Sequence, residues 1–248
     1  MDLVKGCVAL VTGGGRGIGR AVVQELAAEG ADVALTFQRD ETSAQEVVDA
    51  LLAMGRRARA FRADVTDYEQ AQQVVREIVG AWGRLDILVN NAGIHQNDVI
   101  WAMDEERWDA VVDVNLKGTF NYIRAVAPLF REQKSGKIVS VASIHGLRGR
   151  AAGPNYSAAK AGVIGLSKSV ARDLGPCGVN VNVVAPGIVE TDMVRALPAD
   201  VRDRFLAEIV LGRIGQPEDV AALVAFLCSD RARHIHGEVI KVDGGQYI

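Results

Sequence analysis

Hydrophobic and polar residues follow two alternating patterns along the chain. Short runs of β-branched and aliphatic residues predict seven strands, at residues 7–11, 32–37, 58–63, 85–89, 137–141, 179–184 and 238–242. Longer segments between them repeat their apolar residues at helical spacing. Strands that alternate with helices are typical of βαβ units, in which a parallel sheet is covered on both faces. The pattern therefore predicts an α/β fold, with one doubly wound domain spanning residues 1–248.

The helices between these strands are predicted at residues 43–54, 105–132, 155–174 and 217–229, in addition to one that ends near Glu29. Gly30 follows that first helix, where a left-handed cap is expected. Two capping boxes, Ser43-x-x-Glu46 and Thr66-x-x-Glu69, predict the starts of the next two helices. The charged segment 189–210 is also helical in pattern.

Composition and charge narrow the class of protein. Hydrophobic residues make up 49% and charged residues 24%, which excludes a disordered chain, a collagen and a disulfide-stapled scaffold. The net charge of −3 argues against a general nucleic-acid surface. Scattered cysteines, no signal-peptide pattern and no membrane-length apolar run favour a reduced, cytoplasmic protein. No residue spacing suggests a metal site, including that of His234 and His236.

A glycine-rich loop, TGGGRGIG at residues 12–19, follows the first predicted strand. Gly13 permits a sharp turn, Gly17 allows a pyrophosphate to approach the backbone, and Gly19 allows close packing of helix and strand. The following helix N-terminus offers free N–H groups and partial positive charge to phosphates. Because the loop lies between a strand and a helix, we predict a Rossmann-type dinucleotide site rather than a flexible turn.

Further motifs occur in the order found in short-chain dehydrogenase/reductases. The segment NNAG at 90–93, Asn115, Ser143, the YSAAK segment at 156–160, and Pro186-Gly187 with Thr191 all match. The chain resembles this family from about residue 5 to residue 246. Within the family it is most similar to 3-oxoacyl-[acyl-carrier-protein] reductases, through VNLKG at 114–118, AAKAGVIG at 158–165, PGIVETDM at 186–193 and VDGG at 242–245.

The resemblance implies a catalytic set of Asn115, Ser143, Tyr156 and Lys160. In the family, the tyrosine gives its proton to a carbonyl oxygen that the serine also binds, while the asparagine positions a water. Tyr156 and Lys160 share one helix face, and a neighbouring ammonium is expected to lower the tyrosine pKa. The alternative is an ordinary surface Tyr/Lys pair. His95 and His145 are expected near the pocket mouth, in structural or solvated roles, with contact to the substrate as the alternative.

The resemblance also implies a nicotinamide cofactor. NAD-preferring members place an acid at the end of the second strand, but here no acid occurs before Asp40. Arg39 and Arg16 instead suit a 2′-phosphate, so we predict NADPH over NADH. The alternative is a solvated Arg39 and no preference, or one for NAD. The expected cofactor contacts are Gly13, Gly15, Arg16, Gly17, Ile18, Gly19, Arg39, Asp64, Val65, Asn91, Ala92, Gly93, Tyr156, Lys160, Pro186, Gly187, Ile188, Val189 and Thr191.

The implied reaction is the reduction of a 3-oxoacyl thioester, on acyl-carrier protein or CoA, in fatty acid biosynthesis. Lys134 and Arg172 are expected near the mouth to dock an acidic carrier protein, although both also suit ordinary helix positions. The resemblance further implies a homotetramer and a substrate lid near 189–210. A sugar or other secondary-alcohol dehydrogenase is the alternative, and a non-catalytic nicotinamide-sensing protein is a more remote one. No nucleic-acid or membrane partner is expected.

Overall fold

The strands expected from the sequence form one parallel sheet in the computed structural model, which describes residues 2–248 except the side chain of Met193. Their order across the sheet is β3-β2-β1-β4-β5-β6-β7. This confirms the predicted single-domain Rossmann fold with seven parallel strands. The strands are β1 (Val8–Val11), β2 (Asp32–Phe37), β3 (Ala58–Arg62), β4 (Ile87–Asn90), β5 (Gly136–Val141), β6 (Val179–Pro186) and β7 (Val239–Val242).

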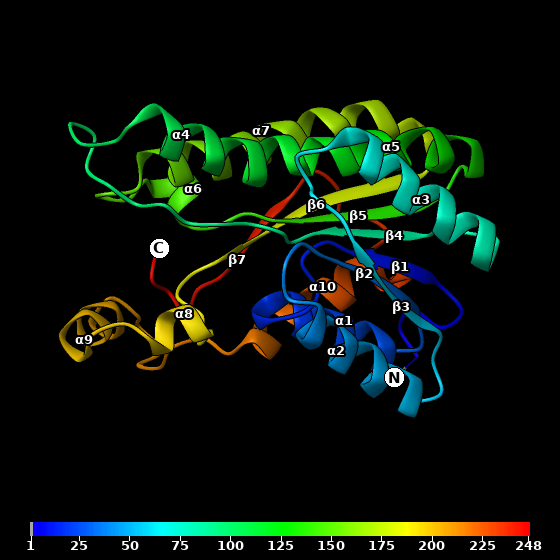
Figure 1. The fold of residues 1–248 in the computed structure, drawn as a ribbon, viewed down its shortest axis with the longest axis horizontal. Helices are drawn as coiled ribbons and strands as arrows, with labels where there is room; N and C mark the ends of the chain where they lie inside the picture. The colour runs from blue at the N-terminus through cyan, green and yellow to red at the C-terminus, as the bar shows by residue number, and fades with distance from the viewer. Residues whose placement is uncertain (1) are drawn as a thin grey trace.

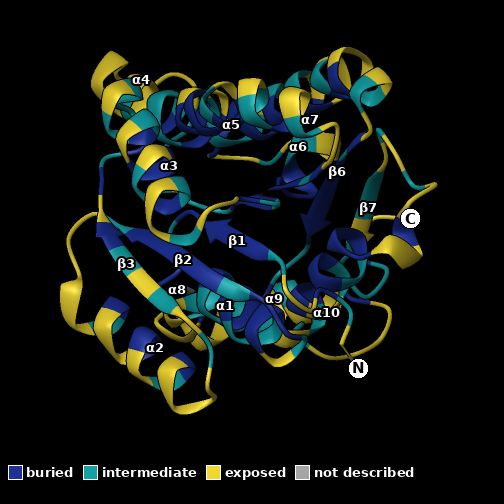
Figure 2. Ribbon diagram, turned by 90° about the vertical axis from the view of Figure 1, so that its right-hand side faces the viewer, coloured by how far each residue is buried: buried dark blue, intermediate teal, exposed yellow. Residues whose placement is uncertain are grey.

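Helices cover both faces of the sheet (Figure 1). One layer contains α1 (Gly17–Ala28), α2 (Glu41–Ala53) and α10 (Pro217–Cys228). The other contains α3 (Tyr68–Trp82), α5 (Gly118–Gln133) and α7 (Pro154–Leu174). Shorter turns join these elements: α6 (His145–Arg148), and the 3₁₀ turns Gly175–Cys177 and Asp230–Ala232. Because both faces are covered, the central strands β1 and β4 are buried along their whole length. Figure 2 shows this for β1, which is drawn in dark blue.

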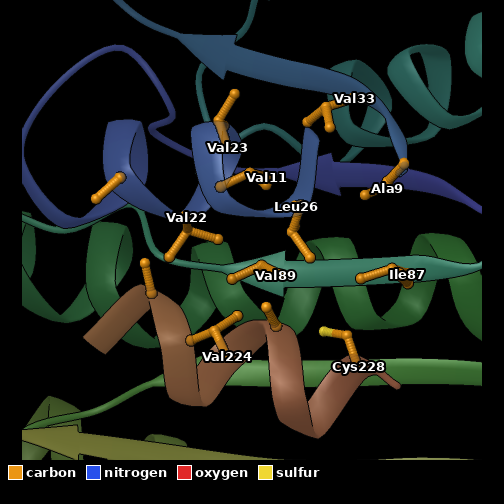
Figure 3. Packing of buried hydrophobic residues seen from close by; sticks show 14 of the residues in the cluster. Ala9, Val11, Val22, Val23, Leu26, Val33, Ile87, Val89, Val224 and Cys228 are labelled. Carbon is orange, nitrogen blue, oxygen red and sulfur yellow. The ribbon is translucent and has the colours of Figure 1, made fainter. Parts of the chain in front are cut away.

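The core on the α1 side is aliphatic and closely packed. Val22 and Leu26 of α1 face Val89 and Ile87 of β4, and Val224 of α10 closes the same layer (Figure 3). All five side chains are fully buried. Burying such a side chain contributes about 1.5–3 kcal/mol. This packing fixes α1, and with it the glycine loop that precedes it.

The strand order reverses between β1 and β4, so the connections that leave these neighbouring strands go to opposite faces. The carboxyl ends of all parallel strands lie at one edge of the sheet. The loops after β1, β4, β5 and β6 therefore meet there, and they carry the motifs found in the sequence. In α/β sheets of this kind, this edge is where ligands bind.

Two local predictions need correction, the capping boxes and the uninterrupted helix at 105–132, whereas the helical pattern of 189–210 is confirmed. Asp40 caps α2 by accepting from the Ser43 N–H (3.0 Å) and hydroxyl (2.6 Å), and Asp67 similarly caps α3. Neither predicted capping box starts its helix. In both cases the residue directly before the helix is an aspartate, and its side chain already accepts from the free N–H groups of the first turn. The helix expected at 105–132 is divided into α4 (Glu105–Val112), a π-helical turn (Asp113–Lys117) and α5. The segment 189–210 holds two short helices, α8 (Asp192–Arg195) and α9 (Ala199–Ala207).

Candidate active site

The glycine loop leaves the N-terminus of α1 open. Arg16, at the N-cap position, makes no side-chain cap hydrogen bond, so the first N–H groups of the helix remain free to donate to a ligand. Gly13 (φ +65°) and Gly17 (φ +52°) adopt left-handed backbone that other residues disfavour. A Cβ at Gly13 would lie 3.0 Å from the Ala92 Cα, and one at Gly19 would collide with the Gly13 carbonyl oxygen. The loop therefore forms a compact cradle that suits a phosphate group.

The loop after β4 is tied directly to this cradle. The side-chain amide of Asn91 donates to the carbonyl oxygens of Thr12 and Gly13, each at 3.0 Å. In return, the Thr12 hydroxyl accepts from the N–H groups of Asn91 (3.0 Å) and Ala92 (3.1 Å). These four bonds fix the carboxyl ends of β1 and β4 together across the switch point.

Asn115 holds the next part of the same loop. It is fully buried in the π-helical turn, and its side chain exchanges two hydrogen bonds with the backbone of Ile94, at 2.8 and 2.9 Å. The Thr119 hydroxyl donates to the Asn115 carbonyl oxygen at 2.9 Å. π-Turns within α-helices occur frequently at functional sites. The expected role of Asn115 in positioning a water stays a prediction, since its side chain is already engaged.

Tyr156 and Lys160 lie on one face of α7, near its N-terminus. The Lys160 ammonium is buried and donates to the Val141 carbonyl oxygen at 2.8 Å, and burial lowers its pKa to about 8. Its nitrogen lies 5.7 Å from the centre of the Tyr156 ring. Burial raises the pKa of Tyr156 to about 12, although hydrogen bonding with Ser143 and the charge of Arg150 act in the opposite direction. The expected lowering of this pKa is wrong for this structure, because desolvation outweighs the neighbouring charges.

Two histidines enclose the tyrosine ring. The His95 ring stacks on it with centroids 3.9 Å apart, and the His145 ring meets it edge-on at 6.5 Å. Burial lowers the pKa of both histidines to about 4, so both imidazoles are neutral at pH 7. The sequence placed them near the pocket mouth in structural or solvated roles, whereas here they form the walls around Tyr156. Their positions in the sequence, two residues after NNAG and two after Ser143, indicate that they lie close to the site.

A polar pocket adjoins His145 and has a volume of about 390 Å³. Sequence reasoning missed its residues, which come from the α6–α7 connection and from α9: Arg148, Gly149, Arg150, Ala151, Phe205 and Glu208. Arg148 pairs with Glu208 at 2.6 Å and also donates to the Gln246 carbonyl oxygen at 3.3 Å. The pocket thus lies between the catalytic loop after β5 and the segment that contains α8 and α9.

The remaining predicted cofactor contacts are distributed around the same edge. The loop after β6 lies against the cradle, because a Cβ at Gly17 would lie 3.3 Å from the Thr191 methyl group. Next to Pro186, the Gly187 N–H donates to the Val242 carbonyl oxygen at 3.0 Å. Asp64 accepts from the side chains of Gln38 (2.9 Å) and Thr66 (2.8 Å). Of the other predicted contacts, Gly15, Arg16 and Ile18 lie within the loop, Val65 follows Asp64, Gly93 lies beside Asn115, Ile188 and Val189 precede Thr191, and Arg39 follows β2.

Lys134 and Arg172 do not lie at the mouth of this site. Lys134 directly precedes β5, and Arg172 lies in the last turn of α7. Both are therefore at the amino-terminal edge of the sheet, whereas Ser143 and Tyr156 lie at the carboxyl edge. The expectation is wrong because each residue lies at the C-terminal end of its helix, whereas the site lies near the N-terminal ends of the same helices.

Other candidate groups serve the structure. His236 accepts from the Val181 N–H at 3.2 Å, and its other ring nitrogen lies 2.9 Å from the Ala171 carbonyl oxygen. Among residues 2–248 no three histidine, cysteine or acidic side chains gather as a metal site would require. Nor does the described part of the chain contain a helix long and apolar enough to cross a bilayer.

A family model described as "Enoyl-(Acyl carrier protein) reductase" matches residues 13–246, nearly the whole chain. The chain belongs to the short-chain dehydrogenase/reductase family. This membership makes the protein an oxidoreductase that acts on a CH–OH or keto group with a nicotinamide cofactor. The open N-terminus of α1 and the glycine cradle fit the pyrophosphate of such a cofactor.

Relatives within the short-chain dehydrogenase/reductase family are similar over almost their full lengths. The chain is 44% identical to a 3-oxoacyl-[acyl-carrier-protein] reductase of Staphylococcus epidermidis over 240 residues, which cover 97% of this chain and 98% of that protein. It is 43% identical to the Escherichia coli protein of the same name, with 98% of each covered. The crystal structure of gox2181 superposes with a TM-score of 0.94 at 37% identity, covering 99% of this chain and 97% of that one.

Proposed function

We propose that the protein catalyses the NADPH-dependent reduction of a 3-oxoacyl thioester, carried by acyl-carrier protein or CoA, to the 3-hydroxyacyl thioester. The names of relatives at 43–44% identity support this substrate class. The observation that carries the catalytic part is the placement of Tyr156. Its ring lies between two neutral histidines, beside Ser143 and a buried lysine, at the ligand-binding edge of the sheet.

In this proposal Tyr156 is the general acid. A phenol with a pKa of about 12 is fully protonated at pH 7, so it is ready to give its proton to the oxygen of the reduced ketone. Ser143 binds the same oxygen and orients it. Lys160 is held by the Val141 carbonyl oxygen, beside the place where a nicotinamide ribose would be bound. When bound, the reduced nicotinamide supplies the hydride.

A substrate panel that follows NADPH oxidation tests the function. The panel presents acetoacetyl-acyl-carrier protein, acetoacetyl-CoA and small ketones, with sugars and secondary alcohols assayed in the reverse direction. We expect the two thioesters to give the highest kcat/KM. A higher value for a sugar would favour the alternative dehydrogenase. Turnover of no substrate, together with tight nicotinamide binding, would favour the sensing protein.

NADPH is the proposed cofactor because Asp40, the first acid after the end of β2, is already engaged. Both carboxylate oxygens of Asp40 bind Ser43, which leaves them poorly placed to accept from ribose hydroxyls. Arg16 and Arg39 are exposed, and neither forms an ion pair in the described part of the chain, although the charge of Arg16 helps to lower the pKa of the Asp40 carboxyl. Two free guanidinium groups near the end of β2 suit a 2′-phosphate.

Measuring kcat/KM with each cofactor tests this preference, and we expect NADPH to be the better one. Arg39→Ala should reduce kcat/KM for NADPH by about 10-fold or more, because one charge-assisted hydrogen bond is worth about 1.5–3 kcal/mol. The value for NADH should stay within about 2-fold, which controls for general damage. A native preference for NADH would contradict the proposal.

The segment 189–210 is proposed as a substrate lid. Glu208 attaches it to the rest of the site by an ion pair with Arg148 (2.6 Å) and by accepting a hydrogen bond from the Gln246 side chain (3.1 Å). α9 buries none of its residues, and it lies apart from the packed layers in Figure 1. Polar attachments of this kind can break and reform without opening the core.

We also propose a homotetramer that docks an acyl-carrier protein in the cytoplasm. An apolar groove of about 280 Å³ lies between α5 and α7, where Phe120 is 42% exposed. Gly165 has open space around its Cα, so its small size serves no contact within this chain. Both features suit close approach of a second chain.

The three free cysteines fit the reducing conditions of the cytoplasm. For docking of the acyl-carrier protein, the basic residues beside the pocket of a single chain are Arg148 and Arg150, and not Lys134 and Arg172 as expected from the sequence.

A further inference from the structure

The pocket beside His145 has a positive charge that the reaction proposed above does not use. Three ionised groups line it: Arg148, Arg150 and Glu208. Arg148 and Glu208 form an ion pair at 2.6 Å, and the Gln246 side chain donates to the same carboxylate oxygen at 3.1 Å. These two residues therefore neutralise each other.

Arg150 is different, because its guanidinium has no hydrogen-bond or ion-pair partner among residues 2–248. Its central carbon lies 5.7 Å from the centre of the Phe205 ring on α9, so the aromatic face holds the group in the pocket. His145, at the inner wall, is neutral at pH 7 because burial lowers its pKa. The pocket accordingly has a net charge of about +1 at pH 7, carried by Arg150.

This charge lies close to the reacting group. The field of Arg150 lowers the pKa of Tyr156, His95 and His145 alike, although burial has the larger effect on each histidine. His145 belongs both to the pocket wall and to the enclosure of Tyr156, with its ring 6.5 Å from the tyrosine ring. An anion bound by Arg150 would therefore share the His145 wall with a ketone held by Tyr156 and Ser143.

We propose that Arg150 binds a carboxylate of the substrate, and that the enzyme has a further activity in the reduction of free 3-oxo acids to 3-hydroxy acids. A thioester carbonyl has no charge to pair with Arg150. The phosphate on a carrier's long arm is many bonds away from the ketone. A free 3-oxo acid, in contrast, carries its carboxylate two bonds from the carbonyl carbon, so that Arg150 would pair with the carboxylate while Tyr156 meets the ketone. A planar carboxylate also suits the fork of a guanidinium.

The chemistry of this activity is the same as for any ketone in this site. The carbonyl carbon accepts a hydride from the reduced nicotinamide, and the C=O π bond breaks as its electrons move to oxygen. That oxygen takes the proton of Tyr156, which is then replaced from solvent. The products are the 3-hydroxy acid and the oxidised cofactor, and the carboxylate is unchanged.

The test compares acetoacetate with methyl acetoacetate, in which one ester methyl group replaces the negative charge, by NADPH oxidation at pH 7. We expect kcat/KM of the native enzyme to be about 10- to 100-fold higher for acetoacetate, the ratio that corresponds to one charge-assisted hydrogen bond. Arg150→Gln should bring the acid-to-ester ratio of kcat/KM close to 1, because only the acid loses a charge-assisted contact. Any effect of Arg150 on the pKa of Tyr156 acts on both substrates and leaves the ratio unchanged. Arg150→Lys should keep part of the advantage of acetoacetate.

Arg204→Gln is the matched control, because Arg204 lies on α9 beside Phe205 but pairs with Asp200 in an exposed position. It should leave the ratio unchanged. Equal rates for the two native substrates, or equal losses for both in Arg150→Gln, would overturn the proposal. Acetoacetyl-CoA is assayed in the same experiment. If it failed to react, the proposed thioester function would be contradicted, but the proposal for Arg150 would not, because that proposal is tested by the ratio of acetoacetate to methyl acetoacetate.

Discussion

Tyr156→Phe is expected to lower kcat for ketone reduction by about 10²- to 10⁴-fold, the usual contribution of a general acid. The substitution removes the hydroxyl, and with it both the proton that the proposed mechanism delivers and the hydrogen bond with Ser143. The ring remains between His95 and His145, so the stack at 3.9 Å and the pocket wall are preserved. Single-turnover kinetics with NADPH measure the loss. Cofactor affinity, followed by nicotinamide fluorescence, should change by no more than about 2-fold.

Tyr68→Phe controls for the loss of a phenol elsewhere, because Tyr68 lies on α3 and contacts Arg124 and Gln72 rather than the site. It should retain near-native turnover. If Tyr156→Phe also turned over at a near-native rate, Tyr156 would not be the acid. A loss of folding in Tyr156→Phe would show in its circular dichroism and is not expected from a side chain of nearly equal volume.

Gly19→Ala is expected to abolish cofactor binding, with Kd raised by about 100-fold or more. A Cβ at this position would point at the Gly13 carbonyl oxygen and the Asn91 amide, both closer than van der Waals contact allows. The first is backbone and cannot rotate away, so the cradle must open and lose its fit to the pyrophosphate. Calorimetric titration with NADPH measures the binding. Overpacking of this kind also lowers the free energy of unfolding by about 1–3 kcal/mol, which thermal unfolding measures.

Gly80→Ala is the control for Gly19→Ala. Gly80 lies inside α3, and a Cβ there would meet no atom within 4 Å. Alanine is the better helix former by about 1 kcal/mol, so this variant should be as stable as the native protein or more so. It should also bind NADPH normally. Native affinity in Gly19→Ala would show that the loop tolerates a wider cradle than its contacts indicate.

The fold could be read from the sequence because its strands are apolar runs with clear turn residues between them. What the sequence could not show was competition between equally good local signals. Ser43 with Glu46 is a valid capping pattern, but Asp40 lies upstream and binds both the N–H and the hydroxyl of Ser43. Likewise, a single helical period spans 105–132, and the π-turn at Asp113–Lys117 adds no pattern of its own.

The candidate site divides in the same way. Tyr156, Lys160 and the glycine loop have fixed spacing within one helix or one turn, so sequence alone could place them together. Arg148 and Glu208 are 60 positions apart and meet only because α9 folds back over the loop after β5. The expected lowering of the Tyr156 pKa is wrong for a related reason. The burial that raises this pKa depends on the surrounding fold and not on the spacing of Tyr156 and Lys160.

The strand order also affects how the chain folds during synthesis. β1 is at the centre of the sheet and pairs with β2 on one side and β4 on the other. As the chain leaves the ribosome, β1 to β3 can pair first, while the other edge of β1 stays open until residue 90 has emerged. An open, fully apolar strand edge invites pairing with other chains. Newly made protein is therefore most exposed to aggregation midway through synthesis, before β4 covers that edge.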